Sequence, residues 1–66
     1  MKVLVNGEAR SVADDTTVRD LLAAMGCDRP GVAVAVDGVV VPRARWASTP
    51  LVDGAVVEVL TAVQGG

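Results

Sequence analysis

Apolar residues occur along the chain in short blocks that turn residues separate. The blocks rich in strand-forming residues span residues 1–5, 8–13, 32–36, 39–41 and 55–61. Asn6-Gly7 between the first two blocks predicts a two-residue hairpin turn, because both residue types tolerate a positive φ. Asp37-Gly38 predicts a second turn of this kind, and Asp53-Gly54 predicts a turn before the last block.

One segment has helical instead of alternating periodicity. Its apolar residues follow the i, i+3, i+4, i+7 spacing of one helix face: Val18, Leu21, Leu22 and Met25. Thr17 and Asp20 are spaced as in a capping box, with Asp in place of the usual Glu or Gln. Gly26 supplies the positive φ at which many helices end. The pattern predicts a helix over residues 18–25, which must pack on a sheet because two turns alone are unstable.

The order of these elements predicts an α+β domain with a hairpin, a crossing helix and further strands. A single helical turn is expected over residues 43–47, with Trp46 packed in the small core. The block 55–61 is the longest and most apolar, so it is expected at the centre of the sheet, parallel to the first strand. The folded domain would span residues 1–61, and residues 62–66 would form an extended, flexible tail.

Alternation along the central strands predicts which side chains face the helix. Glu58 must lie near solvent, because burying an unpaired carboxylate is costly. Val57 and Val59 are then core residues, while Leu60 shares the outer face with Glu58. Leu4 is expected on the same open side, so Leu4 and Leu60 would form an apolar patch near the base of the tail. Such a patch often marks a partner site, although single exposed leucines are also common.

Composition excludes several classes of function. The chain has six basic and eight acidic residues and one aromatic residue, whereas nucleic-acid binders show basic faces and stacking aromatics. It has no histidine and a single cysteine, Cys27, which excludes histidine-dependent catalytic dyads, histidine-ligated metal sites and an internal disulfide. No signal peptide is visible, and no apolar run approaches the ~20 residues of a membrane span. The sequence predicts a soluble cytoplasmic protein, monomeric alone, without contacts to nucleic acid or membrane.

Four features of the sequence together point to a known family. They are the length of 66 residues, Thr17-Val18 followed by Leu21-Leu22, Val41-Pro42-Arg43 followed by Trp46, and Asp53-Gly54 before a last strand that leads to Gly65-Gly66. On these features the chain resembles the sulfur carrier proteins of thiamine biosynthesis, the ThiS family, and more broadly the ubiquitin-like β-grasp fold. A terminal Gly-Gly alone is a weak motif, but in combination with the other segments at these spacings it is fairly specific.

The resemblance implies a mixed sheet of about five strands and a carrier that is not itself an enzyme. Its reactive group would be the carboxylate of Gly66, which a ubiquitin-activating-type adenylyltransferase would adenylate with Mg-ATP and convert to a thiocarboxylate. Thiazole synthase would receive the sulfur, and the carrier itself would bind no cofactor and no metal. Leu4 and Leu60 would contact the partner. The tail residues expected to thread into the partner are Val63, Gln64 and Gly65.

Other interpretations remain open at this point. The small subunits of molybdopterin synthase share the fold and the terminal glycines, so the sulfur could serve molybdopterin or another metabolite. A ubiquitin-like modifier would instead join Gly66 to lysines of target proteins, and a plain interaction domain would have an inert tail. Cys27 is better explained as a small apolar residue than as a sulfur-handling thiol. Arg43 and Arg45 are either partner contacts or solvated surface charges.

Overall fold

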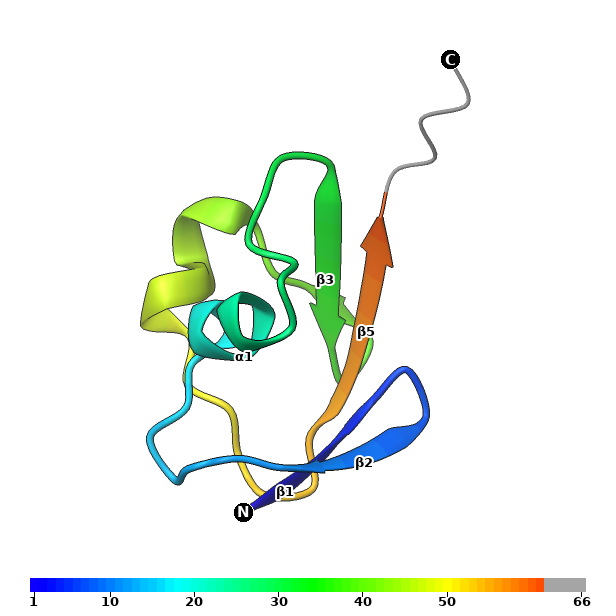
Figure 1. The fold of residues 1–66 in the computed structure, drawn as a ribbon, viewed down its shortest axis with the longest axis vertical. Helices are drawn as coiled ribbons and strands as arrows, with labels where there is room; N and C mark the ends of the chain where they lie inside the picture. The colour runs from blue at the N-terminus through cyan, green and yellow to red at the C-terminus, as the bar shows by residue number, and fades with distance from the viewer. Residues whose placement is uncertain (62–66) are drawn as a thin grey trace.

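The structure is a computed structural model that describes residues 1–61 (Figure 1). Within these residues it contains a five-stranded mixed sheet, one α-helix and one 3-10 helix. The strands are β1 (Lys2–Val5), β2 (Glu8–Ser11), β3 (Val32–Val36), β4 (Val39–Val40) and β5 (Val56–Thr61). The helices are α1 (Val18–Ala24) and the 3-10 helix η1 (Arg43–Ser48). The predicted α+β class and the predicted order of elements are confirmed.

The last strand lies at the centre of the sheet, as predicted. The strand order is β2-β1-β5-β3-β4. β5 pairs in parallel with β1, where Val56 is the partner of Leu4. It pairs antiparallel with β3, where Leu60 is the partner of Ala33. Figure 1 shows α1 packed across one face of the sheet, and no other element of residues 1–61 lies across the opposite face. The central strand therefore carries the chain from the core to the start of the tail segment.

Both predicted hairpin turns are present with the expected backbone. Asn6 has a φ of 51° and Gly7 a φ of 85°, and Asp37 and Gly38 have φ values of 51° and 82°. Two successive positive φ values are those of a type I′ turn, whose twist matches that of the paired strands. β2 ends at Ser11, earlier than predicted, because the chain then turns toward α1.

The start and end of α1 follow the sequence signals. The Thr17 hydroxyl accepts a hydrogen bond from the Asp20 N–H at 3.2 Å, and the Asp20 carboxylate accepts one from the Thr17 N–H at 3.1 Å. The predicted capping box is therefore confirmed, with Asp in the place of Glu. Met25 caps the helix one residue before Gly26, whose φ of 72° allows the chain to leave it.

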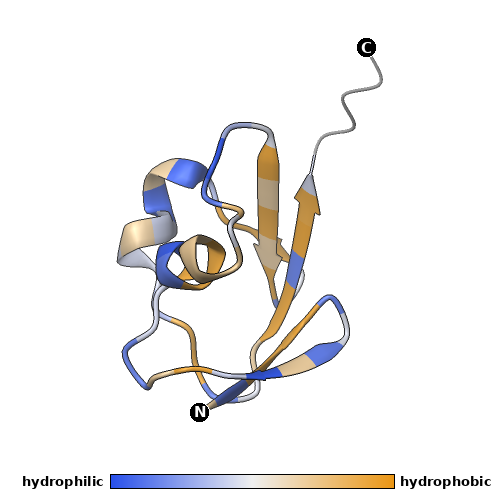
Figure 2. Ribbon diagram, viewed as in Figure 1, coloured by the Kyte–Doolittle hydropathy of each residue, from blue (hydrophilic) through white to orange (hydrophobic). Residues whose placement is uncertain are grey.

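The core lies between α1 and the covered face of the sheet, with η1 closing one side. Its buried residues come from the sheet, from both helices and from the segment before β5. They are Val3, Val5, Val18, Leu21, Leu22, Val34, Trp46, Leu51, Ala55, Val57 and Val59. Figure 2 shows the hydrophobic positions concentrated on the strands and on the inner side of α1. Residues 32–36, an all-apolar run typical of a buried strand, are buried on one side only, because no described element covers the outer face. Only Val34 is buried there, and Ala33 is exposed.

Candidate functional site

The tail predicted to carry the chemistry begins where the described residues end. The predicted site residues Val63, Gln64, Gly65 and Gly66 lie outside the described part of the chain. The last described residue is Thr61, which pairs with Val32 at one end of the sheet. The surfaces around this end of β5 are therefore the part of the candidate site that the structure provides.

Asn6 fixes the end of β5 with its side chain. Its Oδ1 accepts a hydrogen bond from the Val59 N–H at 2.8 Å, and its Nδ2 donates to the Val59 carbonyl at 3.2 Å. β1 ends at Val5. Beyond this residue the side-chain amide of Asn6 takes the place of strand backbone and extends the parallel pairing with β5 to Val59. At the start of β5 the Asp37 carboxylate accepts a hydrogen bond from the Val56 N–H at 2.9 Å. Both hairpin turns therefore hold the strand that leads to the tail.

We expect Asn6→Gly to loosen the end of β5. Glycine keeps the positive φ without strain, so this change removes only the two side-chain hydrogen bonds and leaves both Val59 groups without them. Unsatisfied groups of this kind cost roughly 1–3 kcal/mol each when buried. Amide hydrogen exchange should accelerate at Val59 more than at Val34, which lies in the neighbouring strand. Equal exchange at Val59 in both proteins would show that Asn6 does not hold the strand.

The open face of the sheet carries the predicted patch. Leu4 and Leu60 are 40% and 69% exposed and point away from α1, as predicted. Leu60 lies one residue before the end of β5. Leu4 lies beside Val56, roughly 13 Å from Leu60 along the strand at ~3.3 Å per residue. The prediction that Leu4 also lies near the base of the tail is therefore wrong.

The exposed apolar surface is larger than the sequence indicated. Val56 is 43% exposed and Val40 is 70% exposed. Val40 lies on the same face as Glu58, because Val40 pairs with Ala35 and Ala35 pairs with Glu58. Residues that pair directly across strands share a face of the sheet. We call Leu4, Val40, Val56 and Leu60 the open-face patch; Glu58 lies on the same face, between Val56 and Leu60 along β5. The alternation that places Glu58 on the open face could have placed Val56 there from the sequence alone. The placement of Val40 on this face required the register between β3 and β4.

The remaining candidates have structural explanations in the described residues. Cys27 is half-buried against the core, and its thiol donates to the Met25 carbonyl at 3.6 Å, as expected of a small apolar residue. Residues 1–61 contain no cluster of three or more side chains that could hold a metal ion. Neither helix in this part of the chain is long and apolar enough to span a membrane.

Comparison with known proteins identifies the family. The family model described as the ThiS family matches residues 3–66, which is nearly the whole chain. The chain belongs to the ThiS family. The match extends through the terminal Gly65-Gly66, so it includes the segment in which the sequence places the reactive group. ThiS proteins are small sulfur carriers of thiamine biosynthesis.

Two curated relatives and two solved structures support this assignment. The sulfur carrier protein ThiS of Escherichia coli is 32% identical over 66 residues, which cover all of both chains. A thiazole synthase of Paramagnetospirillum magneticum is 35% identical over 66 residues, so this chain spans only 20% of that longer protein. The crystal and solution structures of a thiamine biosynthesis protein from Geobacter metallireducens are 33% identical, with TM-scores of 0.83 and 0.81. Both structures cover all of this chain, and this chain covers 100% of the crystal structure and 88% of the solution structure. This similarity confirms the β-grasp fold.

Proposed function

We propose that this ThiS protein carries sulfur as a thiocarboxylate on Gly66 and delivers it for thiazole formation in thiamine biosynthesis. The observation that carries this proposal is the family match over residues 3–66, which includes Gly66. The E. coli relative of the same length is a sulfur carrier protein. Gly66 would be the site of the chemistry, and the domain over residues 1–61 would be the part that partners recognise.

The chemistry requires activation because a carboxylate is a poor acyl donor. An oxygen of the Gly66 carboxylate would attack the α-phosphorus of Mg-ATP in a ubiquitin-activating-type adenylyltransferase, and pyrophosphate would leave. A sulfur nucleophile would then attack the carbonyl carbon, and AMP would leave with the electrons of the C–O bond. The resulting thiocarboxylate sulfur is a nucleophile that an acceptor enzyme can use. The carrier would supply the acyl group and no catalytic side chain.

Two glycines suit an end that must enter an enclosed active site. Without a Cβ, Gly65 and Gly66 can adopt backbone angles that other residues avoid and leave the carbonyl carbon unhindered. Residues 62–66 can span up to roughly 17 Å at ~3.3 Å per residue. That reach would place Gly66 in a partner's active site while the folded domain stays outside. Threading would involve Val63, Gln64 and Gly65.

Thiazole synthase is the acceptor that the comparisons favour. A protein named thiazole synthase in P. magneticum contains a stretch 35% identical to this whole chain. A carrier-like stretch within the same polypeptide would raise its effective concentration at the acceptor site. We therefore propose that this chain forms a transient complex with a thiazole synthase, as well as with its adenylyltransferase.

The open-face patch is the proposed docking surface for these partners. Ordering a tail on binding lowers affinity, and burial of Leu60 and its apolar neighbours would offset that cost. We expect Leu60→Thr to weaken binding to the adenylyltransferase roughly tenfold, because a buried Leu contributes about 1.5–3 kcal/mol. Threonine is β-branched and favours strands, so the fold should persist.

The matched control for Leu60 is Val52, which is 62% exposed in the turn before β5. Val52→Thr should leave the dissociation constant unchanged when both variants are measured by calorimetry against the same enzyme. Equal affinities for the two variants would contradict the assignment of the docking surface.

Exchange of labelled pyrophosphate into ATP tests the proposed function. In the presence of the adenylyltransferase, exchange should depend on this protein and should stop when Gly66 is removed. Exchange that proceeds equally without Gly66 would contradict the proposed role of the terminal carboxylate.

A further inference from the structure

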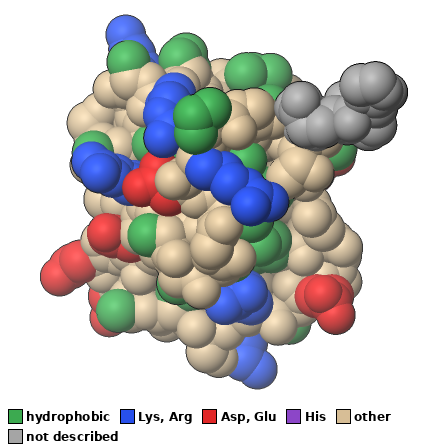
Figure 3. Space-filling model, turned by 45° about the horizontal axis from the view of Figure 1, so that its top comes forward, with side chains coloured by type: hydrophobic (Ala, Val, Ile, Leu, Met, Phe, Trp, Pro, Cys, Tyr) green, Lys and Arg blue, Asp and Glu red, His purple; other side chains and the backbone are tan. Residues whose placement is uncertain are grey.

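Basic side chains are concentrated on the helical side of the molecule. Four of the six basic residues lie in α1, in the loop after it, or in η1, and all four are exposed. These residues are Arg19, Arg29, Arg43 and Arg45. Figure 3 shows several basic side chains gathered around an acidic group on this face. A chain with a formal charge of −2 therefore has a local excess of positive charge.

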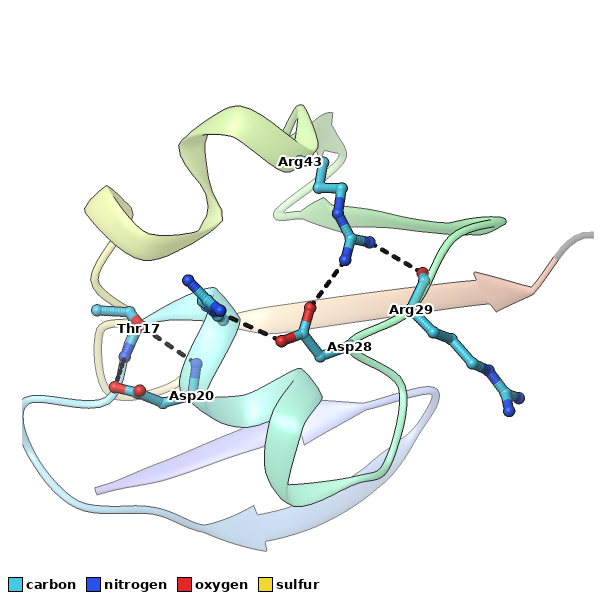
Figure 4. A network of polar contacts seen from close by, with 6 residues as sticks. Thr17, Asp20, Asp28, Arg29 and Arg43 are labelled. Carbon is cyan, nitrogen blue, oxygen red and sulfur yellow. Dashed lines mark hydrogen bonds and ion pairs between the residues drawn. The ribbon is translucent and has the colours of Figure 1, made fainter.

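Asp28 joins two of these arginines (Figure 4). Its Oδ1 accepts from Arg43 Nη2 at 3.1 Å, and its Oδ2 lies 3.4 Å from Arg19 Nε. Arg43 also donates from Nη1 to the Arg29 carbonyl at 2.9 Å, and its guanidinium lies 4.8 Å from the centre of the Trp46 ring. Arg43 is thus held by a carboxylate, a carbonyl and an aromatic face, which gives it a structural role.

Arg19 is held at one atom only. Its side chain is 61% exposed, and the one ion pair of its guanidinium within residues 1–61 is formed through Nε, with Asp28. A guanidinium fixed through Nε keeps the edge formed by its two terminal nitrogens free for bidentate binding of a carboxylate. Because the contact with Asp28 already restricts the side chain, less conformational entropy is lost when a ligand binds.

A hollow between α1 and η1 is lined in part by Arg19. It is open to solvent and has a volume of about 590 Å³, enough for a side chain with its neighbouring backbone. Its lining residues are Arg19, Asp28, Arg43, Ala44, Trp46 and Ala47. Two guanidinium groups and one carboxylate leave a net charge near +1, which suits one carboxylate better than a polyphosphate. The small apolar walls suit the methylene groups of an acidic side chain.

The loop that contains Asp28 connects the hollow to β3, which pairs with β5. The loop from Asp28 enters β3 at Val32, and Val32 pairs with Thr61. Four residues span at most ~13 Å, and paired strands are ~5 Å apart. Asp28 is therefore within roughly 18 Å of Thr61, which sets an upper limit on the distance between this edge of the hollow and the end of β5.

We propose that the hollow receives a glutamate or aspartate side chain of the adenylyltransferase, bound by the terminal nitrogens of Arg19. This inference rests on the proposed function, because it concerns the enzyme that would activate Gly66. The contact adds an electrostatic element to docking at a site separate from the open-face patch. It speeds encounter and fixes the orientation of the domain while the tail enters the enzyme.

The test compares two arginines whose loss changes the net charge equally. Arg19→Gln should raise the dissociation constant for the adenylyltransferase roughly tenfold at low ionic strength, the effect of one charge-assisted hydrogen-bonded contact. Arg10→Gln is the control, since Arg10 is exposed on β2, away from the hollow. The difference between the variants should shrink in 0.5 M salt, where the screening length is about 4 Å. Both residues are exposed, so both variants should keep the circular dichroism spectrum of the parent.

Each other outcome has a definite meaning. Equal dissociation constants for Arg19→Gln and Arg10→Gln would overturn this inference and leave the proposed function standing. Weaker binding by Arg19→Gln to thiazole synthase alone would overturn the assignment to the adenylyltransferase. Failure of the unmodified protein to bind the adenylyltransferase would overturn the proposed function, and this inference with it.

Discussion

Trp46→Ala is expected to remove most of the stability of the domain. Trp46 is 2% exposed, and it is the largest of the fully buried side chains. Truncation of such a residue costs about 3–5 kcal/mol, whereas a domain of this length has a total stability of roughly 3–10 kcal/mol. The variant should therefore be largely unfolded or should unfold well below the temperature of the parent. A small domain has no second core to compensate for this loss.

The matched variant for this prediction is Trp46→Phe, which keeps most of the buried volume. It removes the indole N–H that donates to the Val41 carbonyl at 2.9 Å, so a smaller loss of about 1–3 kcal/mol is expected. Urea unfolding should be followed by far-ultraviolet circular dichroism, because Trp46 is the only aromatic residue and both variants lose its fluorescence. Equal stability of the parent and Trp46→Ala would contradict the placement of Trp46 in the core.

Deletion of Gly66 is expected to abolish the proposed chemistry and leave the fold intact. The shortened chain still ends in a glycine carboxylate, on Gly65, but this group is ~3.3 Å short of its position in the full chain. Misplacement of a reacting group by 1 Å can cost about a hundredfold in rate, so we expect a loss of at least a thousandfold in thiocarboxylate formation.

Gly66→Ala is the control for chain length. It keeps the number of residues and adds only a Cβ, so activity should fall less than in the deletion variant. The two variants and the parent should unfold at the same urea concentration, because the core lies within residues 1–61. A deletion variant that forms the thiocarboxylate as fast as the parent would contradict the assignment of Gly66.

Local signals in the sequence predicted most of the fold. Asn6-Gly7 and Asp37-Gly38 specify their turns through the backbone angles that these residue types tolerate. Thr17 and Asp20 specify the start of α1 through hydrogen bonds between residues three apart. The position of Glu58 in the alternating pattern of β5 was sufficient to assign the two faces of this strand, because only the solvent-facing side could hold a carboxylate.

The features that the sequence did not predict depend on contacts between distant residues. Asn6 was predicted as a turn residue, but its side chain also holds Val59, 53 positions along the chain. The residues of β3 are all Val or Ala, so their pattern could not show which face is open. The pairing of Asp28 with Arg19 and Arg43 depends on how α1 and η1 pack together. No spacing in the sequence encodes that arrangement.

The most direct test of the central claim is the intact mass of the protein after incubation with its adenylyltransferase, Mg-ATP and a sulfide source. We expect a gain equal to the exchange of one oxygen for one sulfur, absent when Gly66 is deleted or ATP is omitted. An unchanged mass, with an enzyme that converts another ThiS protein in the same assay, would contradict the claim that this chain carries sulfur at its C-terminus.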